Sequence, residues 1–341
     1  MTLEPFYSTT ARSRSGTEDE RVLLGDIGGT NARFALFAGG ALGPVEHYPV
    51  AAYPNIAAAI AAFLARQEQA DTITSAVLGV AGPVEGGRTE LVNSGWVIDA
   101  AALGAGLGFA RVALVNDFEA IAWALLKFTP DHLKPIGGGR AEPGRVMVAL
   151  GPGTGLGLAA MIPGKPHRVI ATEGGHANLA ASSEREDAVI AQIRRKLGRV
   201  SVERALSGPG LQNLYGAIAE LDRIDVPARK AAEITQSAMD GSCAVSKAAL
   251  DMFCALLGTV AGDMALLFRA RGGIYLAGGI LPRITDYVAQ SEFRARFVAK
   301  GRMRSYLEAI PTSIVMHTDP AFLGLVAAIE SESAAPPPPR V

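Results

Sequence analysis

A strand–glycine turn–strand pattern occurs twice in this chain, and it constrains the possible folds more than any other feature. The first copy is "RVLLGDIGGTNARFALF" (21–37), and the second is "RVMVALGPGTGLGLAAMI" (145–162). Each copy has two apolar runs of strand length joined by a glycine-rich stretch, which is the pattern of a β-hairpin. Each half of the chain is therefore predicted to contain one glycine hairpin.

The two copies keep the same order of residues around their turns. When their first arginines are superposed, Gly29-Thr30 falls on Gly153-Thr154, 124 residues later. A second echo, "VAGPV" (80–84) and "LAGGI" (276–280), has a spacing of 196 residues. The shared order indicates a duplication whose second half carries roughly 70 additional residues, mostly helical in pattern, at about 180–270.

Strand-like runs also alternate with alanine-rich helical runs in the first half of the chain. Strands are predicted at 75–84 and 110–115, and helices are predicted at 53–69 and 118–128. This alternation is typical of α/β proteins.

The composition disfavours several classes of protein. Of the 341 residues, 49% are hydrophobic and 19% are charged, and the formal net charge of −1 argues against a dedicated binder of nucleic acid or of a membrane surface. No apolar run reaches the ~18 residues needed to span a bilayer. The two cysteines, Cys243 and Cys254, are expected to be reduced thiols in a reducing compartment.

The two ends of the chain differ from the rest in composition. Residues 1–20 are polar and lack the apolar core of a signal peptide, so we expect a disordered leader there. The proline-rich stretch "SESAAPPPPRV" cannot continue a helix, and we expect a loose tail at 333–341.

Both glycine turns are suited to phosphate binding. "GDIGGTN" (25–31) and "GPGTGLG" (151–157) would let backbone N–H groups converge on phosphate oxygens, and each supplies a threonine hydroxyl. The alternative is that these glycines only serve hairpin turns that need positive φ. The dinucleotide-binding pattern fails in every register of the second loop, and "GPVEGGRT" (82–89) has an arginine where a phosphate-binding loop needs lysine.

Only the first hairpin carries an acid. Asp26 lies in the first glycine loop, whereas Leu150 has the equivalent place in the second. A single carboxylate beside a phosphate loop is suited to Mg²⁺, either directly or through the waters of the ion. The alternative is an aspartate that stabilises the turn.

A polar pair follows a buried strand in "ALVNDFEAIAWAL" (113–125). Asn116 and Asp117 stand between the apolar strand and an amphipathic helix. A carboxylate desolvated at the end of a strand is a stronger base, and general bases typically contribute ~10²–10⁴-fold to a rate. Asn116 and Glu119 also match a capping box for the helix, a role that is compatible with catalysis.

A second polar group lies in "TEGGHANL" (172–179), where Glu173 and His176 flank two glycines. The glycines would let the backbone approach a ligand closely. A buried carboxylate can accept hydrogen bonds from two vicinal hydroxyls, and an imidazole nitrogen adds a further contact. A surface turn is one alternative. A zinc site is the other, and it is disfavoured because no second histidine or cysteine lies nearby.

Together with "ERALSGPGLQNLY" (203–215) and "YLAGGILPRI" (275–284), these motifs resemble the bacterial glucokinase family of the hexokinase and actin-like ATPase superfamily. The resemblance covers about residues 21–330, and the ordered set of motifs carries it rather than any single one. The related repressor–ORF–kinase family has a cysteine-rich zinc motif after its sugar-binding histidine, and this chain has no such cluster.

The resemblance implies a duplicated ribonuclease-H-like α/β fold, that of the actin-like ATPases, with two lobes around a cleft. We accordingly expect a small α/β domain at 21–127 plus 318–332 and a large α/β domain with a helical insertion at 128–317. ATP and Mg²⁺ are the implied cofactors, with Asp26 as the metal-binding residue. The implied nucleotide contacts are Gly25, Asp26, Ile27, Gly28, Gly29, Thr30, Gly153, Thr154, Gly155, Gly278 and Gly279. From the residues alone, Gly278-Gly279 is equally a plain strand-to-helix turn.

The implied activity is the ATP-dependent phosphorylation of glucose to glucose 6-phosphate in glycolysis. The resemblance makes Asp117 the general base and assigns glucose contacts to Asn116, Asp117, Glu173, His176 and Glu203. In "LVNSGW" (91–96) it adds Asn93 or Ser94. Without the family, Glu203 would be an ordinary acid in the first turn of a helix.

The family also implies a cytoplasmic homodimer with glucose and ATP as partners and with no nucleic-acid or membrane partner. One alternative is a kinase for another hexose, such as fructose or N-acetylmannosamine. Another is a sugar-sensing regulator, although the twenty polar residues before the first strand leave no room for a helix-turn-helix. A structural ATPase like actin would have an acid in both phosphate loops, and Leu150 argues against it.

Overall fold

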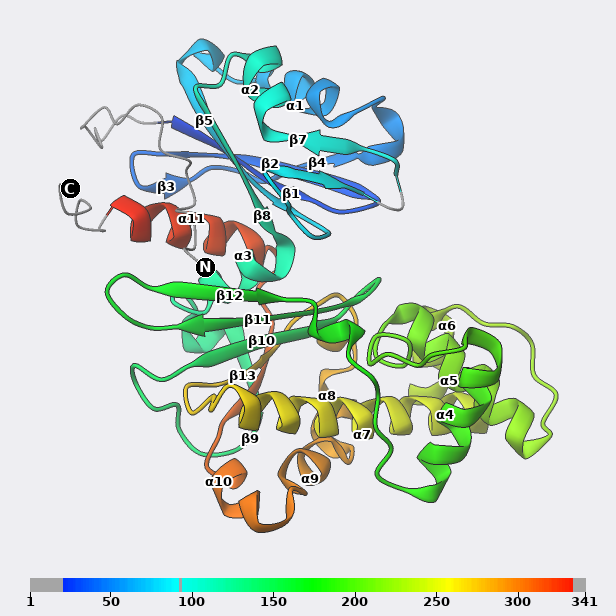
Figure 1. Ribbon diagram of the computed structural model, residues 1–341. Helices are drawn as coiled ribbons and strands as arrows, with labels where there is room; N and C mark the ends of the chain where they lie inside the picture. The colour runs from blue at the N-terminus through cyan, green and yellow to red at the C-terminus, as the bar shows by residue number, and fades with distance from the viewer. Residues whose placement is uncertain (1–20, 92–93, 334–341) are drawn as a thin grey trace. The chain divides into compact units, whose positions relative to one another are not determined.

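The computed structural model describes residues 21–91 and 94–333 of the chain. The expectations for the leader at 1–20, for Asn93 and for 334–341 lie outside the described residues. The chain divides into two compact units. Of the described residues, unit 1 contains 21–91, 94–127, 165–167 and 319–333, and unit 2 contains 128–164 and 168–318. Each unit is built around its own sheet (Figure 1).

Unit 1 has a six-stranded sheet with the order β3-β2-β1-β5-β8, and β4 pairs with β2. β1 is antiparallel to β2 and parallel to β5, and β5 is parallel to β8. The predicted hairpin and the two strands that follow it are therefore found. The strands are β1 (Arg21–Ile27), β2 (Asn31–Ala38), β3 (Ala41–Leu42), β4 (Glu46–Pro49), β5 (Ile73–Val80) and β8 (Arg111–Asn116), with β6 (Arg88–Glu90) and β7 (Val97–Asp99) in a separate pair.

Helices cover both faces of this sheet because successive strand residues point to opposite sides. Leu23 packs in one buried cluster with Phe63 of α1, and its neighbour Leu24 packs in another with Phe322 of α11. The helices of unit 1 are α1 (Ile56–Leu64), α2 (Ala100–Leu107), α3 (Asp117–Ala124) and α11 (Pro320–Ser333), with short 3-10 turns at Val50–Ala52 and Ala70–Thr72. α1 and α3 are shorter than the predicted 53–69 and 118–128.

Unit 2 has a six-stranded sheet with the order β12-β11-β10-β13-β14-β9. β10 is antiparallel to β11 and parallel to β13, and β13 is parallel to β14. The second predicted hairpin is thus β10–β11. The strands are β9 (Leu133–Gly137), β10 (Met147–Pro152), β11 (Leu156–Ile162), β12 (Arg168–Thr172), β13 (Gly273–Leu276) and β14 (Thr312–Val315).

The two sheets share strand order and strand direction over five strands. β3-β2-β1-β5-β8 in unit 1 matches β12-β11-β10-β13-β14 in unit 2, and each pair of neighbours has the same orientation in both. The two echoes in the sequence fall at corresponding places. The glycine turns follow β1 and β10, and the segments at 80–84 and 276–280 lie at the carboxyl ends of β5 and β13.

The longer helices of unit 2 lie between β12 and β13, in the region where the sequence predicted a helical insertion. The long helix α7 is central to the core, where its Phe253 belongs to the same buried cluster as Leu214 of α5 and Phe293 of α9 (Figure 1). The helices are α4 (Glu184–Leu197), α5 (Gly208–Asp222), α6 (Ala231–Met239), α7 (Ala244–Leu267), α8 (Thr285–Gln290), α9 (Phe293–Val298) and α10 (Arg304–Glu308). Short 3-10 turns lie at Pro130–His132, Gly174–His176, Leu281–Arg283 and Gly301–Met303.

α7 corrects one expectation from the sequence. By length and composition it is apolar enough to cross a membrane, although we expected no such segment. Its most apolar window is 67% buried inside the protein, which is the property of a core helix in a globular domain. Both cysteines lie at this helix as free thiols, Cys243 at its N-cap and Cys254 fully buried.

Candidate active site

Asp26 lies near the carboxyl end of β1 and is buried. It is directly opposite Arg33 of β2 in the hairpin register, and the Arg33 guanidinium forms an ion pair with it. The same guanidinium donates a hydrogen bond to Oδ1 of Asp319 at 2.7 Å. Burial raises the pKa of Asp26, and the positive charge of Arg33 opposes that rise. Sequence reasoning missed Arg33, although counting back across the predicted hairpin would have placed it opposite Asp26.

These residues fit a magnesium ion that arrives with a nucleotide. Among residues 21–91 and 94–333, no group of three or more His, Cys, Asp or Glu side chains could hold a metal ion. Mg²⁺ usually takes only one or two protein carboxylates and completes its shell with waters and substrate phosphates. Asp26 and Asp319 are two carboxylates beside the guanidinium of Arg33, and carboxylates are the protein ligands that such an ion takes.

The first glycine turn combines buried and accessible positions. Gly25 has no room for a side chain, because a β-carbon there would lie 2.6 Å from Cδ2 of Leu78 on the neighbouring strand β5. At the turn itself, the N–H of Gly28 donates to the carbonyl of Asn31 at 2.9 Å, and Thr30 is exposed. The glycines of the two hairpin turns do not have positive φ, so the explanation by positive φ is wrong for both.

The second glycine turn lies against the end of β13. Its N–H at Gly153 donates to the carbonyl of Gly155 at 2.8 Å, and Thr154 is exposed at the tip. Gly278 has a φ of +91°, and a β-carbon there would lie 3.1 Å from the carbonyl carbon of Pro152. Only glycine permits this approach. Unit 2 therefore brings the second glycine turn together with the Gly278-Gly279 pair.

Asn116 ends β8 and is the N-cap of α3, as its capping pattern predicted. Its Oδ1 accepts the N–H groups of Phe118 at 2.9 Å and Glu119 at 3.2 Å, and its Nδ2 donates to the carbonyl of Gly82 at 3.0 Å. Burial raises the pKa of Glu119 to about 7, and a hydrogen bond from the backbone of Asn116 opposes that rise. Asp117, the first residue of α3, is half-buried, and its Oδ1 accepts the N–H of Phe118 at 2.8 Å.

Glu173 and His176 differ from the expectation of a buried carboxylate. Their side chains are 61% and 57% exposed, and Nε2 of His176 lies 3.8 Å from Oε2 of Glu173. The glycines between them serve packing within the chain, since a β-carbon at Gly175 would lie 3.2 Å from Cβ of Leu156 on β11. The backbone of this loop is pressed onto the sheet, and its two polar side chains are left free to reach solvent or a ligand.

Glu203 lies in a turn before α5 and not in a helix, because α5 begins only at Gly208 after its N-cap Ser207. Its Oε2 accepts the N–H of Leu156 at 3.0 Å, and its own N–H donates to the carbonyl of Gly175 at 2.9 Å. Glu203 therefore contacts both the second glycine hairpin and the loop of Glu173 and His176. Those partners are 47 and 28 residues away in the chain, so no local pattern could have shown them.

The predicted site residues thus form one group in each unit. Asp26, the first glycine turn and the Asn116-Asp117 pair belong to unit 1. The second glycine turn, Glu173, His176, Glu203 and the Gly278-Gly279 pair belong to unit 2. A residue that sequence reasoning missed is Arg199, which donates to the carbonyl of His176 at 2.9 Å. No sequence signal distinguishes it from other exposed arginines.

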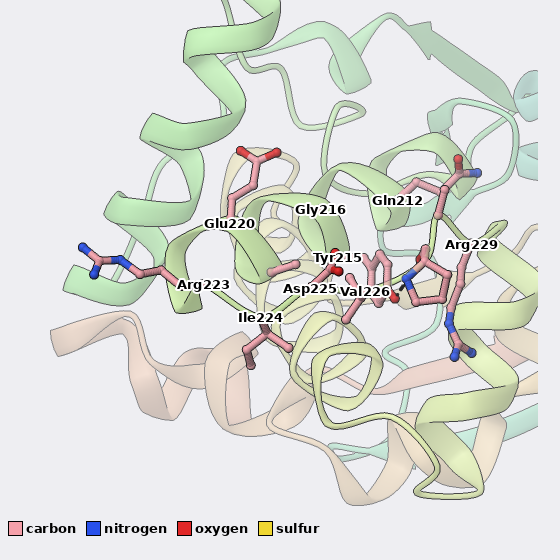
Figure 2. Close-up of a pocket in the computed structure, with 12 residues that line it drawn as sticks. Gln212, Tyr215, Gly216, Glu220, Arg223, Ile224, Asp225, Val226 and Arg229 are labelled. Carbon is pink, nitrogen blue, oxygen red and sulfur yellow. Dashed lines mark hydrogen bonds between the residues drawn. The ribbon is translucent and has the colours of Figure 1, made fainter.

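A cavity of about 600 Å³ lies at the C-terminal end of α5 (Figure 2). Tyr215 contributes to its lining, and its hydroxyl donates to the carbonyl of Pro227 at 3.1 Å. Arg223 and Arg229 line it together with the acids Glu220 and Asp225, and the two arginines point away from each other (Figure 2). None of the predicted site residues contributes to this lining. Size alone therefore does not make the cavity a substrate site.

Comparison with known proteins gives consistent matches along the chain. The Glucokinase family model matches residues 23–332. A glucokinase of Paramagnetospirillum magneticum is 44% identical over 310 residues, which cover 90% of this chain and 96% of that protein.

Solved structures with the same architecture include a glucokinase from an Antarctic psychrotroph. It matches with a TM-score of 0.81 and 33% identity, and the match covers 91% of this chain and 99% of that one. A ROK family glucokinase from Streptomyces griseus, in complex with glucose and AMPPNP, matches with a TM-score of 0.60 and 19% identity over 91% of this chain and 98% of that one. At that identity the second match shows the shared α/β fold alone.

The family match and the relatives agree with the motifs from which the sequence was interpreted. The family model spans nearly all of the described chain, and the Paramagnetospirillum protein is matched along almost its whole length. The chain therefore belongs to the glucokinase family, whose members catalyse the ATP-dependent phosphorylation of glucose.

Proposed function

We propose that Asp117 is the general base in the reaction that family membership assigns to this chain, the ATP-dependent phosphorylation of glucose. The observation that carries this proposal is the anchoring of Asp117 at the first position of α3. Asn116 beside it makes three hydrogen bonds, and the N–H of Phe118 orients Oδ1 of Asp117.

The chemistry asked of Asp117 is the removal of one proton. As the 6-hydroxyl oxygen of glucose forms its bond to the γ-phosphorus of ATP, the bond from that phosphorus to the β,γ-bridging oxygen breaks, and ADP leaves. The hydroxyl proton moves to the carboxylate of Asp117. The N-terminus of α3 favours negative charge at this position.

The proposed glucose contacts are Asn116, Asp117, Glu173, His176 and Glu203, together with Asn93 outside the described residues. The exposed Glu173 and His176 support this role, since neither is consumed by contacts within the core. Carboxylates and an imidazole that are matched to hydroxyl groups would discriminate against sugars that lack one, because a polar group enclosed with the bound sugar is then left unpaired.

The proposed nucleotide contacts are the two glycine turns and the pair Gly278-Gly279. Exposed Thr30 and Thr154 at the two turns and the open backbone of Gly153 support this assignment. Magnesium would be held at Asp26 and by the phosphates, and it would neutralise charge on the phosphates during transfer. Asp26, held by Arg33, would keep that ion at a fixed place.

We further infer that the shared strand order of the two sheets reflects a duplicated ribonuclease-H-like fold, with units 1 and 2 as its two lobes. Cytoplasmic localisation, a role in glycolysis and a homodimeric state are parts of the same proposal. They rest on the family resemblance.

The test of the proposed function is a coupled assay of purified protein with Mg-ATP. Glucose, mannose, fructose and N-acetylglucosamine are compared in parallel. Turnover on glucose that exceeds turnover on the other three sugars by at least tenfold supports the assigned contacts. Preference for another hexose would retain the fold and the base but contradict the proposed specificity.

A further inference from the structure

Glu203 is hydrogen-bonded to the hairpin that carries the second glycine turn. Its Oε2 accepts the N–H of Leu156 at 3.0 Å, and the pair is partly buried. Leu156 is the first residue of β11 and directly follows Gly155. A side chain proposed to bind the sugar is thus also fixed to the loop proposed to bind the nucleotide phosphates.

A side chain at position 155 would collide with Glu203. A β-carbon at position 155 would overlap Oε2 of Glu203 and would lie 3.2 Å from its Cδ. Gly155 does not have positive φ, so its backbone conformation does not demand glycine. Gly153, two residues earlier in the same turn, also lacks positive φ, and a β-carbon there would have no neighbour within 4 Å. Of these two turn glycines, only Gly155 would therefore bring an added β-carbon against Glu203.

The backbone around Glu203 is fixed at both ends. The N–H of Glu203 donates to the carbonyl of Gly175 at 2.9 Å, and the N–H of Gly208 donates to the carbonyl of Gly153 at 2.8 Å. The segment 203–208 therefore connects the loop of Glu173 and His176 with the second glycine turn. With its backbone held in this way, the side chain of Glu203 is the part that can respond to a change in the turn.

We propose that Glu203 is shared between the sugar site and the second glycine turn, so that Gly155, a residue of the nucleotide loop, sets the affinity for glucose. The proposal rests on the proposed function, because it takes Glu203 as a sugar contact. It makes Gly155 a positioning residue for the sugar site. It also couples the two ligands, since a phosphate that moves the Leu156 N–H moves a sugar contact, and such coupling is reciprocal.

The test compares glucose binding to Gly155→Ala and Gly216→Ala by isothermal titration calorimetry in the absence of nucleotide. Gly216 of α5 is the control, because it lies outside the proposed contacts and a β-carbon there has no neighbour within 4 Å. A methyl group at 155 must displace the carboxylate of Glu203 from its contact with the sugar. We expect Gly155→Ala to bind glucose at least tenfold more weakly, whereas Gly216→Ala stays within about twofold of wild type. Equal affinities in the two variants would overturn the proposal.

A double-mutant cycle separates this proposal from the proposed function. Glu203→Ala should weaken glucose binding, and Gly155→Ala should add nothing in that background, because the side chain it displaces is gone. Wild-type glucose affinity in Glu203→Ala would contradict the sugar role of Glu203 itself. Weak binding in Glu203→Ala together with normal binding in Gly155→Ala would contradict only the shared contact.

Hydrogen exchange at Leu156 gives a readout that does not depend on the stability of the Gly155 variant. We expect the Leu156 amide to exchange at least tenfold faster in Glu203→Ala, because its acceptor is lost. Glu173→Gln, which alters another proposed sugar contact, should leave that amide protected. Equal protection in Glu203→Ala and wild type would show that the contact does not exist in solution and would overturn the proposal.

Discussion

Gly324 of α11 packs directly on the backbone of Ala120 of α3, and a β-carbon at position 324 would lie 2.6 Å from the carbonyl carbon of Ala120. It would also lie 3.0 Å from the backbone nitrogen of Ala124. Two helices that are distant in the sequence therefore meet here without intervening side chains. α3 begins at the proposed base, so the position of Asp117 depends on this packing.

Gly324→Ala should destabilise unit 1 strongly, because backbone atoms and not a flexible side chain occupy the space that the methyl group needs. We expect a loss of about 3 kcal/mol or more in the free energy of unfolding, measured by urea denaturation. Gly216→Ala in α5 is the matched control, since a β-carbon there has no neighbour within 4 Å. That variant should be unchanged or more stable by up to ~1 kcal/mol. Similar stability of the two variants would refute the close packing of α3 and α11.

Asp117→Asn should abolish most turnover and leave glucose binding nearly intact. The amide cannot accept the hydroxyl proton, so kcat should fall by ~10²–10⁴-fold. Its oxygen can still accept the Phe118 N–H and a sugar hydroxyl, so the glucose Kd should stay within about threefold of wild type. Steady-state kinetics and calorimetry on the same preparation check both parts. A variant that retains wild-type kcat would exclude Asp117 as the base.

Glu119 should make stability depend on pH between about 5 and 8. Its pKa in the folded protein is raised from 4.5 to about 7, so the protonated form is favoured by folding. The contribution is fully present below pH 4.5 and is lost as the pH rises through 7. Relative to Glu119→Gln, wild type should lose about 1–3 kcal/mol over this range. Urea unfolding of both proteins at several pH values measures the difference, and a constant difference would contradict the raised pKa.

Asp26→Asn should weaken the response to magnesium. The concentration of Mg²⁺ that supports half-maximal binding of an ATP analogue should rise by ~10–100-fold, while the glucose Kd stays unchanged. Glu330→Gln is the control, because it also removes one carboxylate, the partner of Lys127 in the same unit, without touching Asp26. Magnesium titrations of analogue binding follow the effect without requiring turnover. An equal shift in both variants would point to a general electrostatic effect.

Local features of this protein were predictable from the sequence. The strands around each glycine turn and the cap at Asn116 depend on residues within a few positions of one another, and they are found where the patterns placed them. The first sequence echo recurs after 124 residues and located the two hairpins. The second recurs after 196 residues, and the difference located the helical insertion. Both echoes remain recognisable because an insertion between β12 and β13 leaves the order of the strands intact.

Contacts between distant segments were not predictable. The glycines beside Glu173 were interpreted as space for a ligand, but Gly175 makes room for Leu156 of β11. Glu203 was assigned to a helix that begins five residues later, and its hydrogen bond to Leu156 follows from tertiary packing. A single sequence records that a position is glycine and does not record which neighbour requires it.

The return of the chain to unit 1 at Asp319 has a consequence for synthesis on the ribosome. α11 covers the face of the unit 1 sheet that holds Leu24 and Val77, and it is made only after the whole of unit 2. At 5–20 residues per second, this face waits on the order of ten to forty seconds for its covering helix. The unit that is started first is thus the one that is finished last, and until then part of its apolar face lacks a covering helix.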